Sequence, residues 1–115
     1  MFSSSSNVEE LHVKEESRDK TFITNAVNLM KEHYADAEYN LERFVRDMGY
    51  SKTLVNKKMQ DLTGQPIGQF MKNFRLDMGY QLLEQKKGDA NVSEVAYAVG
   101  FNDPKYFTRC FTKQY

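Results

Sequence analysis

Residues 91–115 read NVSEVAYAVGFNDPKYFTRCFTKQY, and the fold of the whole chain follows from this stretch. Val92, Val95 and Val99 recur at helical spacing, which predicts a short helix with one apolar face. Gly100 ends this helix, because the residue just past a helix end often needs a positive φ. The Asn-Asp-Pro sequence that begins two residues later starts a second helix, since Asn and Asp cap helices and Pro is tolerated in the first turn. Two short helices around a tight turn are typical of a helix-turn-helix, whose second helix can enter a DNA major groove.

An earlier part of the chain repeats this pattern. LERFVRDMGYS at residues 41–51 superposes on VSEVAYAVGFN at residues 92–102 with a shift of 51 positions, which pairs Gly49 with Gly100. After the turn the shift becomes 52, so the second turn contains one extra residue. Two copies of one supersecondary unit are far more informative than one.

The apolar spacing predicts four further helices, at about residues 18–34, 41–49, 52–62 and 67–85. Asn40 and Ser51 are expected to cap the second and third of them. Apolar residues of the last helix form two stripes, as a rod packed against both helix-turn-helix units would need. Gly79 in its middle indicates the close approach of another helix, because Gly costs about 1 kcal/mol relative to Ala in a helix interior.

The length of the helix at 67–85 fits two reading positions on one duplex. At ~1.5 Å per residue it spans roughly 28 Å, and two recognition helices on one face of a duplex lie ~34 Å apart. The sequence therefore predicts an all-α, homeodomain-like fold in which this helix joins two helix-turn-helix subdomains. The expected division is a linker or cloning remnant at 1–17, a first subdomain with its N-terminal helix at 18–66, the central helix at 67–85 and a second subdomain at 86–115.

Residues 1–17 are set apart because they lack steady apolar periodicity, which favours a disordered segment. In the whole chain, no apolar run approaches the ~20 residues of a membrane span, and the N-terminus has no hydrophobic leader. The one cysteine, Cys110, gives no disulfide and fits a reducing compartment. We therefore expect a cytoplasmic protein whose segment here makes no membrane contact.

The net charge of the chain is zero, but the charge is unevenly distributed. Residues 1–50 carry six Lys or Arg and ten Asp or Glu, for a net −4. Residues 51–115 carry ten and six, for a net +4, and contain both candidate recognition helices. This modest basicity predicts weak phosphate binding by the domain alone.

Two motifs resemble the DNA-binding domain of the AraC/XylS family of bacterial transcription regulators. They are MGYSKTLVNKKMQDLTGQPIGQFMKNFRL at residues 48–76 and the stretch at 91–115, and the resemblance covers about residues 40–115. Together with DKTFITNAVNLMKEHYADAEYNLERFVRDMGYS at 19–51, the chain is most similar to the version fused to hybrid two-component sensors. In those proteins a receiver domain precedes the DNA-binding domain.

The resemblance implies a sequence-specific regulator that binds double-stranded promoter DNA, with RNA polymerase as a possible further partner. It implies dimerisation through an upstream domain absent from this chain, and it makes residues 1–17 the linker from that domain. The family continues past the position of Tyr115 with a Gly, a Pro and a short last helix, so the second subdomain is expected to be truncated at its C-terminus.

By the same resemblance, the DNA-binding positions are Ser51, Lys52, Thr53, Asn56 and Lys57 in the first unit and Ser93, Lys105, Tyr106 and Arg109 in the second. Asn can bond adenine through two atoms, Lys can donate to guanine, and Arg can donate to both O6 and N7 of guanine. Ser93, at a helix start, is expected to offer its hydroxyl and its N–H to a phosphate. A solvated helix face is the alternative for the charged positions. The alternative for Tyr106 is a partly buried ring against Pro104.

Asp103 is expected to cap its helix, and Leu54 to be partly exposed. His12, His33 and Cys110 lack metal-ligand spacing, and the chain shows no phosphate-binding glycine loop, nucleophile elbow or catalytic triad signature. We therefore expect no enzyme, no cofactor and no metal. A helical module that docks to a signalling or polymerase partner is the alternative, and it would be favoured if the two outward helix faces lay on different sides.

Overall fold

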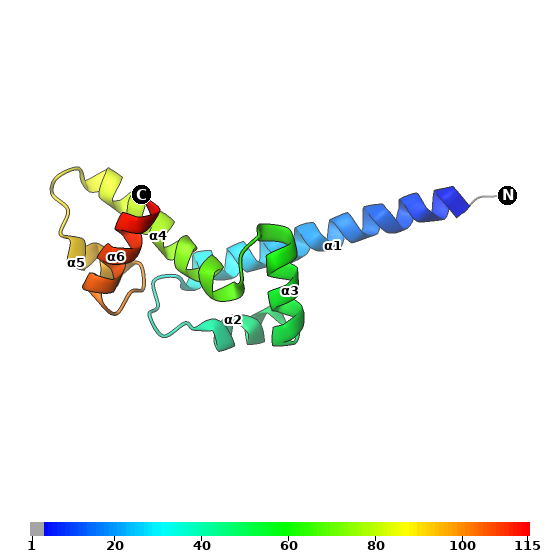
Figure 1. Cartoon of the computed structure of the whole chain (residues 1–115), viewed down its shortest axis with the longest axis horizontal. Coiled ribbons are helices and arrows are strands. Elements are labelled where there is room, and N and C mark those ends of the chain that lie inside the picture. Colours follow the sequence, from blue (N-terminus) through cyan, green and yellow to red (C-terminus); the bar gives the residue numbers. More distant parts are fainter. Residues whose placement is uncertain (1–3) are drawn as a thin grey trace.

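The structure, a computed structural model, describes residues 4–115, with side chains from Val8 onward. Over this range it is all-helical, as predicted, and contains six α-helices and no strand. The helices are α1 (Ser4–His33), α2 (Leu41–Met48), α3 (Lys52–Thr63), α4 (Ile67–Lys86), α5 (Val92–Ala98) and α6 (Pro104–Gln114). Figure 1 shows α2 and α3 at one end of α4, α5 and α6 at the other, and α1 projecting beyond the body of the molecule.

The prediction that the first helix begins near residue 18 is wrong, because α1 begins at Ser4. The added turns pack against nothing within the described chain: Val8, Leu11 and Val13 are each more than 60% exposed. Helix formation there needs no apolar face, since the segment after Ser6 has neither Gly nor Pro and includes an i, i+4 pair between His12 and Glu16 at 2.9 Å. Of the expected linker, residues 1–3 lie outside the described residues.

Two hydrophobic cores share α4. The first core contains Met30 of α1, Phe44 of α2 and Val55 of α3, and α4 adds Ile67 and Met71. The second core packs Leu76 of α4 against α5 and α6, and its members are Leu76, Val95, Ala96, Val99, Phe101 and Phe107. The N-terminal half of α4 therefore belongs to one helix-turn-helix and the C-terminal half to the other, as a rod between the two units requires.

The expected caps are confirmed. Asn40 Oδ1 accepts from the Arg43 N–H at 3.0 Å, and Ser51 Oγ accepts from the Leu54 N–H at 3.2 Å. Asp103 Oδ1 accepts from the Lys105 N–H at 2.9 Å. These side chains satisfy N–H groups that have no partner inside their own helices, and thereby set where α2, α3 and α6 begin.

Gly79 marks a close helix approach, as its position in α4 predicted. A Cβ at this residue would lie 2.9 Å from both Cε1 and Cζ of Phe107. The Phe107 ring is buried and packs edge-on against Phe101 and stacked against Phe111. Because the ring has little room to retreat, α6 can cross α4 at this distance only where α4 lacks a side chain.

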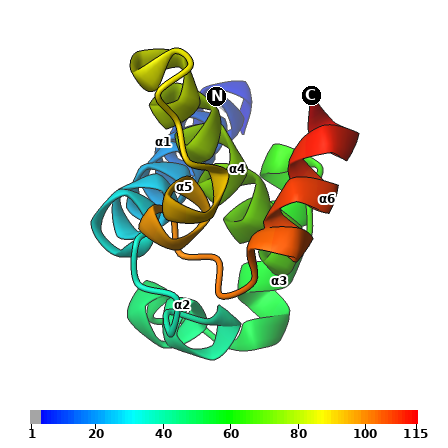
Figure 2. The ribbon, with the colours of Figure 1, turned by 90° about the vertical axis from the view of Figure 1, so that its left-hand side faces the viewer.

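The two second helices of the units face the same way. In Figure 1, α3 stands beside the N-terminal end of α4 and α6 crosses its C-terminal half, and the perpendicular view in Figure 2 places both on one side of the molecule. The long helix α1 lies on the other side. The arrangement that would have favoured a protein-docking module, with outward faces on different sides, is therefore not the one observed.

Candidate nucleic-acid interface

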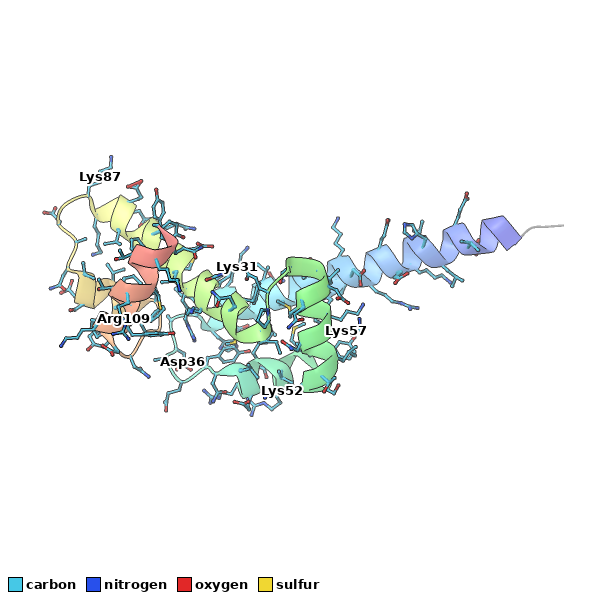
Figure 3. The ribbon with its side chains drawn as sticks, in the orientation of Figure 1. Lys31, Asp36, Lys52, Lys57, Lys87 and Arg109 are labelled. Atoms are coloured by element: carbon cyan, nitrogen blue, oxygen red, sulfur yellow. The ribbon has the colours of Figure 1, made fainter. Side chains whose placement is uncertain are left out.

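The N-terminal half of α3 presents polar side chains to solvent. Lys52 and Thr53 are exposed in its first turn, and Lys52 Nζ lies 3.6 Å from Glu42 Oε2 in an exposed ion pair. Lys57 Nζ lies 2.9 Å from Asp61 Oδ2, one turn further along the same helix, and both side chains are more than half exposed. Exposed pairs of this kind are weak. Lys52 and Lys57 are therefore available to a phosphate or a base edge (Figure 3).

Lys58 has a different role from Lys57. Its Nζ lies 2.7 Å from Asp19 Oδ1, and both side chains are about two-thirds covered. The pair joins α3 to α1 across 39 residues of sequence. Lys58 therefore ties α3 to α1, and it lies about 100° around α3 from Lys57.

Asn56 caps another helix. Its Oδ1 accepts from the Ile67 N–H at 3.1 Å, and the residue is only partly exposed. The residue before α4, Pro66, gives that helix no side-chain cap, so Asn56 supplies one from α3. Reading adenine through two atoms needs the amide oxygen as well as the NH2 group. In this conformation the Asn56 oxygen already accepts one hydrogen bond from the fold, and only its second lone pair and the NH2 group remain.

The exposed face of α6 is cationic. Lys105, Arg109 and Lys113 follow one another at four-residue spacing and are all exposed, and none forms an ion pair with any residue whose side chain the structure describes. Arg109 lies over Tyr106, with its guanidinium carbon 5.5 Å from the ring centroid. Tyr106 in turn leans against the buried Phe101 ring, at a centroid distance of 5.9 Å. The ring orients the arginine by cation–π contact and remains 41% exposed.

Ser93 has one of its two expected donors already engaged. Its N–H donates to Asn91 Oδ1 at 2.9 Å, because Asn91 caps α5. Glu94, directly after it, places a carboxylate in the same turn. Only the exposed Ser93 hydroxyl is left to meet a phosphate.

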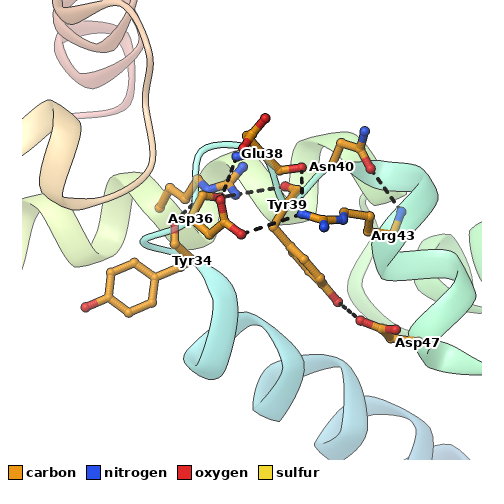
Figure 4. A network of polar contacts seen from close by, with 8 residues as sticks. Tyr34, Asp36, Glu38, Tyr39, Asn40, Arg43 and Asp47 are labelled. Carbon is orange, nitrogen blue, oxygen red and sulfur yellow. Dashed lines mark hydrogen bonds and ion pairs between the residues drawn. The ribbon is translucent and has the colours of Figure 1, made fainter.

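A polar clamp, formed by Arg75 and the loop that precedes α2, positions the two units. Arg75 Nε donates to the Tyr34 carbonyl at 3.0 Å, and a second guanidinium nitrogen, Nη2, donates to the carbonyls of Asp36 at 3.0 Å and Tyr39 at 2.9 Å (Figure 4). Burial lowers the pKa of the Arg75 guanidinium from its ordinary value, but an arginine stays charged at neutral pH. A half-buried charge thus ties α4 to a loop 36–41 residues earlier in the chain.

The turn of the second helix-turn-helix sits against the same clamp. Gly100 has φ +91°, as its place after α5 predicted, and a Cβ there would lie 2.1 Å from the Tyr34 carbonyl oxygen and 2.8 Å from Arg75 Nε. The two units therefore meet through backbone at Gly100, in addition to sharing α4. No sequence pattern indicated this contact.

The same loop is fixed by Tyr39, which is buried. Its hydroxyl donates to Asp47 Oδ2 at 2.8 Å, and its ring stacks on His33 with centroids 4.2 Å apart. Burial, and then the hydrogen bond to the Asp47 carboxylate, raise the pKa of the Tyr39 phenol well above its ordinary value. The carbonyls that Arg75 binds are thus presented by a loop that is anchored at both ends.

Between residues 4 and 115, no helix is both long and apolar enough to cross a bilayer. The described residues also bring together no group of three or more His, Cys, Asp or Glu that could hold a metal ion. What the structure does assemble is two helix-turn-helix units on one rod, with exposed cationic side chains on the second helix of each. This arrangement defines a DNA-binding domain of the double helix-turn-helix class.

Comparison with known proteins gives the family. The chain belongs to the helix-turn-helix domain family of the AraC type, whose match covers residues 44–115, so the resemblance to AraC/XylS regulators is confirmed. It is a DNA-binding domain of a transcription regulator.

The relatives include one protein named as a histidine kinase and others named as transcription regulators. A Formosa agariphila protein named histidine kinase P4 is 29% identical over 114 residues, which cover 99% of this chain and 8% of that protein. The MmsAB operon regulatory protein of Pseudomonas aeruginosa is 34% identical over 85 residues, which cover 73% of this chain and 26% of that protein. The chain thus spans less than a third of the curated relatives it matches.

A solved structure has the same fold. The C-terminal domain of the two-component response regulator yesN from Fusobacterium nucleatum superposes with a TM-score of 0.68 at 24% identity, over 96% of this chain and 97% of that one.

Proposed function

We propose that this chain reads a promoter by placing α3 and α6 in successive major-groove segments on one face of the duplex. The observation that carries the proposal is the placement of both helices on the same side of the molecule, one beside each half of α4 (Figures 1 and 2). The 20 residues of α4 span roughly 30 Å at 1.5 Å per residue. This length is close to the ~34 Å between successive major-groove segments.

In this proposal the exposed side chains of α3 and those of α6 contact different major-groove segments. Lys52, Thr53 and Lys57 of α3 meet one segment, with Ser51 at the helix start. Lys105, Tyr106 and Arg109 of α6 meet the other. Three of the predicted positions have polar atoms that already serve the fold, Ser51, Asn56 and Ser93, and each contributes through its remaining donor: the hydroxyl of Ser51, the NH2 group of Asn56 and the hydroxyl of Ser93.

The relatives support a larger setting for the domain. We propose that it is the output part of a bacterial two-component regulator, that residues 1–17 connect it to an upstream part, and that dimerisation there raises its local concentration on paired sites. Contact with RNA polymerase and a cytoplasmic location belong to the same proposal. The two cores support a division into a first unit at 18–66, the central helix at 67–85 and a second unit at 86–115.

Selection from a pool of random duplexes tests the proposal even though the operator is unknown. The 1–115 chain is expected to enrich two short motifs at one fixed spacing, with centres about 10 base pairs apart. A pool that acquires no motif after repeated rounds, although the chain binds DNA, would count against sequence-specific reading. A single motif would count against the use of both helices.

Arg109→Ala is expected to weaken binding to the selected duplex by about 1–3 kcal/mol and to relax preference at one base position. The reason is that a guanidinium held over Tyr106 can reach guanine O6 and N7 together. Fluorescence anisotropy on the selected duplex and on single-base variants measures both effects. Arg18→Ala on α1 is the charge-matched control. A loss with Arg109→Ala that is equal on all sequences would make Arg109 a phosphate contact instead.

A further inference from the structure

The surface between the two recognition helices is one continuous strip across α4. Three neighbouring hollows make it up. The first is lined by Thr53 and Lys57 of α3 and by Gly68 of α4. The last is lined by Lys72 of α4 and Arg109 of α6. The middle hollow shares Gly68 with the first and Lys72 with the last. We call this surface the α4 strip.

Gly68 and Lys72 lie one turn apart on α4 and so face the same way. A Cβ added to Gly68 would meet no atom within 4 Å, and its φ is not positive. Nothing inside the fold therefore requires glycine there. Because Gly68 has no side chain, nothing protrudes from the α4 strip at this position between α3 and α6. A flat backbone of this kind allows another large molecule to approach closely.

Lys72 is the cation in the middle of the α4 strip that the fold does not use. Within the described chain it forms no ion pair. The middle hollow contains two other charged side chains: Arg75 donates to loop carbonyls, and Asp103 caps α6 while keeping its negative charge. Lys72 is partly exposed and forms an ion pair with neither of them.

A duplex held by two successive major-groove segments turns the intervening minor groove, with its two phosphate strands, toward the protein between the reading helices. On this chain that surface is the α4 strip. We propose that Lys72 binds the backbone phosphates that flank this minor groove, so that α4 is a third DNA contact as well as a spacer. The inference rests on the proposed function of α3 and α6. A phosphate contact positions the duplex and carries no base preference.

Lys72→Gln tests the proposal, with Lys86→Gln near the exposed end of the same helix as the matched control. Loss of one phosphate contact reduces the magnitude of the slope of log K against log[salt] by about 0.9, which corresponds to about fivefold weaker binding at 0.15 M salt if the two proteins bind equally at about 1 M, where the contact is screened. The weakening is expected to be equal on the selected duplex and on unrelated DNA, while Lys86→Gln changes neither slope nor affinity. Thermal unfolding of both variants confirms that they are folded.

A second measurement changes the DNA. Neutral methylphosphonates at the phosphates between the two selected motifs are expected to weaken binding of the original chain and to have less effect on Lys72→Gln, because the two changes remove one contact. If the original chain binds its selected duplex and Lys72→Gln binds it with the same affinity and salt slope, this inference fails and the proposed function stands. If the original chain selects no duplex at all, the proposed function itself fails.

Discussion

Gly100→Ala is expected to lower the free energy of unfolding by about 2–5 kcal/mol, the sum of about 1–2 kcal/mol for a left-handed backbone and about 1–3 kcal/mol for overpacking. Gly100 has φ +91°, and the new Cβ would lie 2.1 Å from the Tyr34 carbonyl oxygen. A backbone oxygen cannot rotate out of the way as a side chain can. Either the loop before α2 or the turn after α5 must therefore move, and the contact between the two units at Gly100 is lost.

Gly88→Ala separates the two causes. Gly88 also has a positive φ, +83°, but a Cβ there would meet no atom within 4 Å. This variant should show the backbone cost alone. Urea denaturation followed by circular dichroism measures both variants. Equal losses at the two positions would show that the approach of Gly100 to Tyr34 does not constrain the fold.

Arg75→Met is expected to lower the free energy of unfolding by about 2–4 kcal/mol. Methionine keeps an apolar stem of similar length but donates no hydrogen bond. The carbonyls of Tyr34 and Tyr39, both in partly buried bonds to Arg75, would lose a charged donor. The carbonyl of Asp36 can turn to water, because that bond is exposed. Denaturant titration measures the change in the free energy of unfolding.

Arg43→Met is the control for this clamp. Arg43 contacts the same loop, at 3.4 Å from the Glu38 carbonyl and 3.6 Å from Asp36 Oδ2, but it does so in solvent. Arg43→Met should lower the free energy of unfolding by less than about 1 kcal/mol.

Arg75→Met should also weaken binding to a duplex with both motifs more than binding to a duplex with one motif, because the clamp fixes the two units relative to each other. Indistinguishable behaviour of the two variants would contradict this positioning role.

Periodicity and turn chemistry were sufficient to predict five of the described helices. The shared pattern around Gly49 and Gly100 identified both turns, and α2, α3 and α4 begin where their predicted helices begin. The start of α1 was missed for a physical reason. Its first turns are stabilised by local propensity without burial, so they leave no apolar stripe to detect. The signal that was available was the absence of Gly and Pro together with the His12–Glu16 pair.

The sequence predicted site residues correctly only where the position of a residue around its helix, relative to the apolar stripe, determines whether its side chain is exposed. Lys57 and Arg109 are exposed, as their positions opposite the apolar stripe indicated. The partner of Asn56 lies 11 residues away, and the partners of Arg75 lie more than 35 residues away and are backbone carbonyls. No side-chain pattern marks a backbone carbonyl or N–H as a partner, so the Arg75 clamp and the capping of α4 by Asn56 could be found only in three dimensions.

Because α4 supplies Met71 to one core and Leu76 to the other, neither core is complete without it. A unit of about 40 residues or fewer is rarely stable by itself. Unwinding of α4 through its middle would therefore weaken both units, and we expect the domain to unfold as a single cooperative body. Because the two units share α4, a ligand that binds and stabilises one unit is expected to stabilise the other as well, and the coupling free energy is the same in both directions.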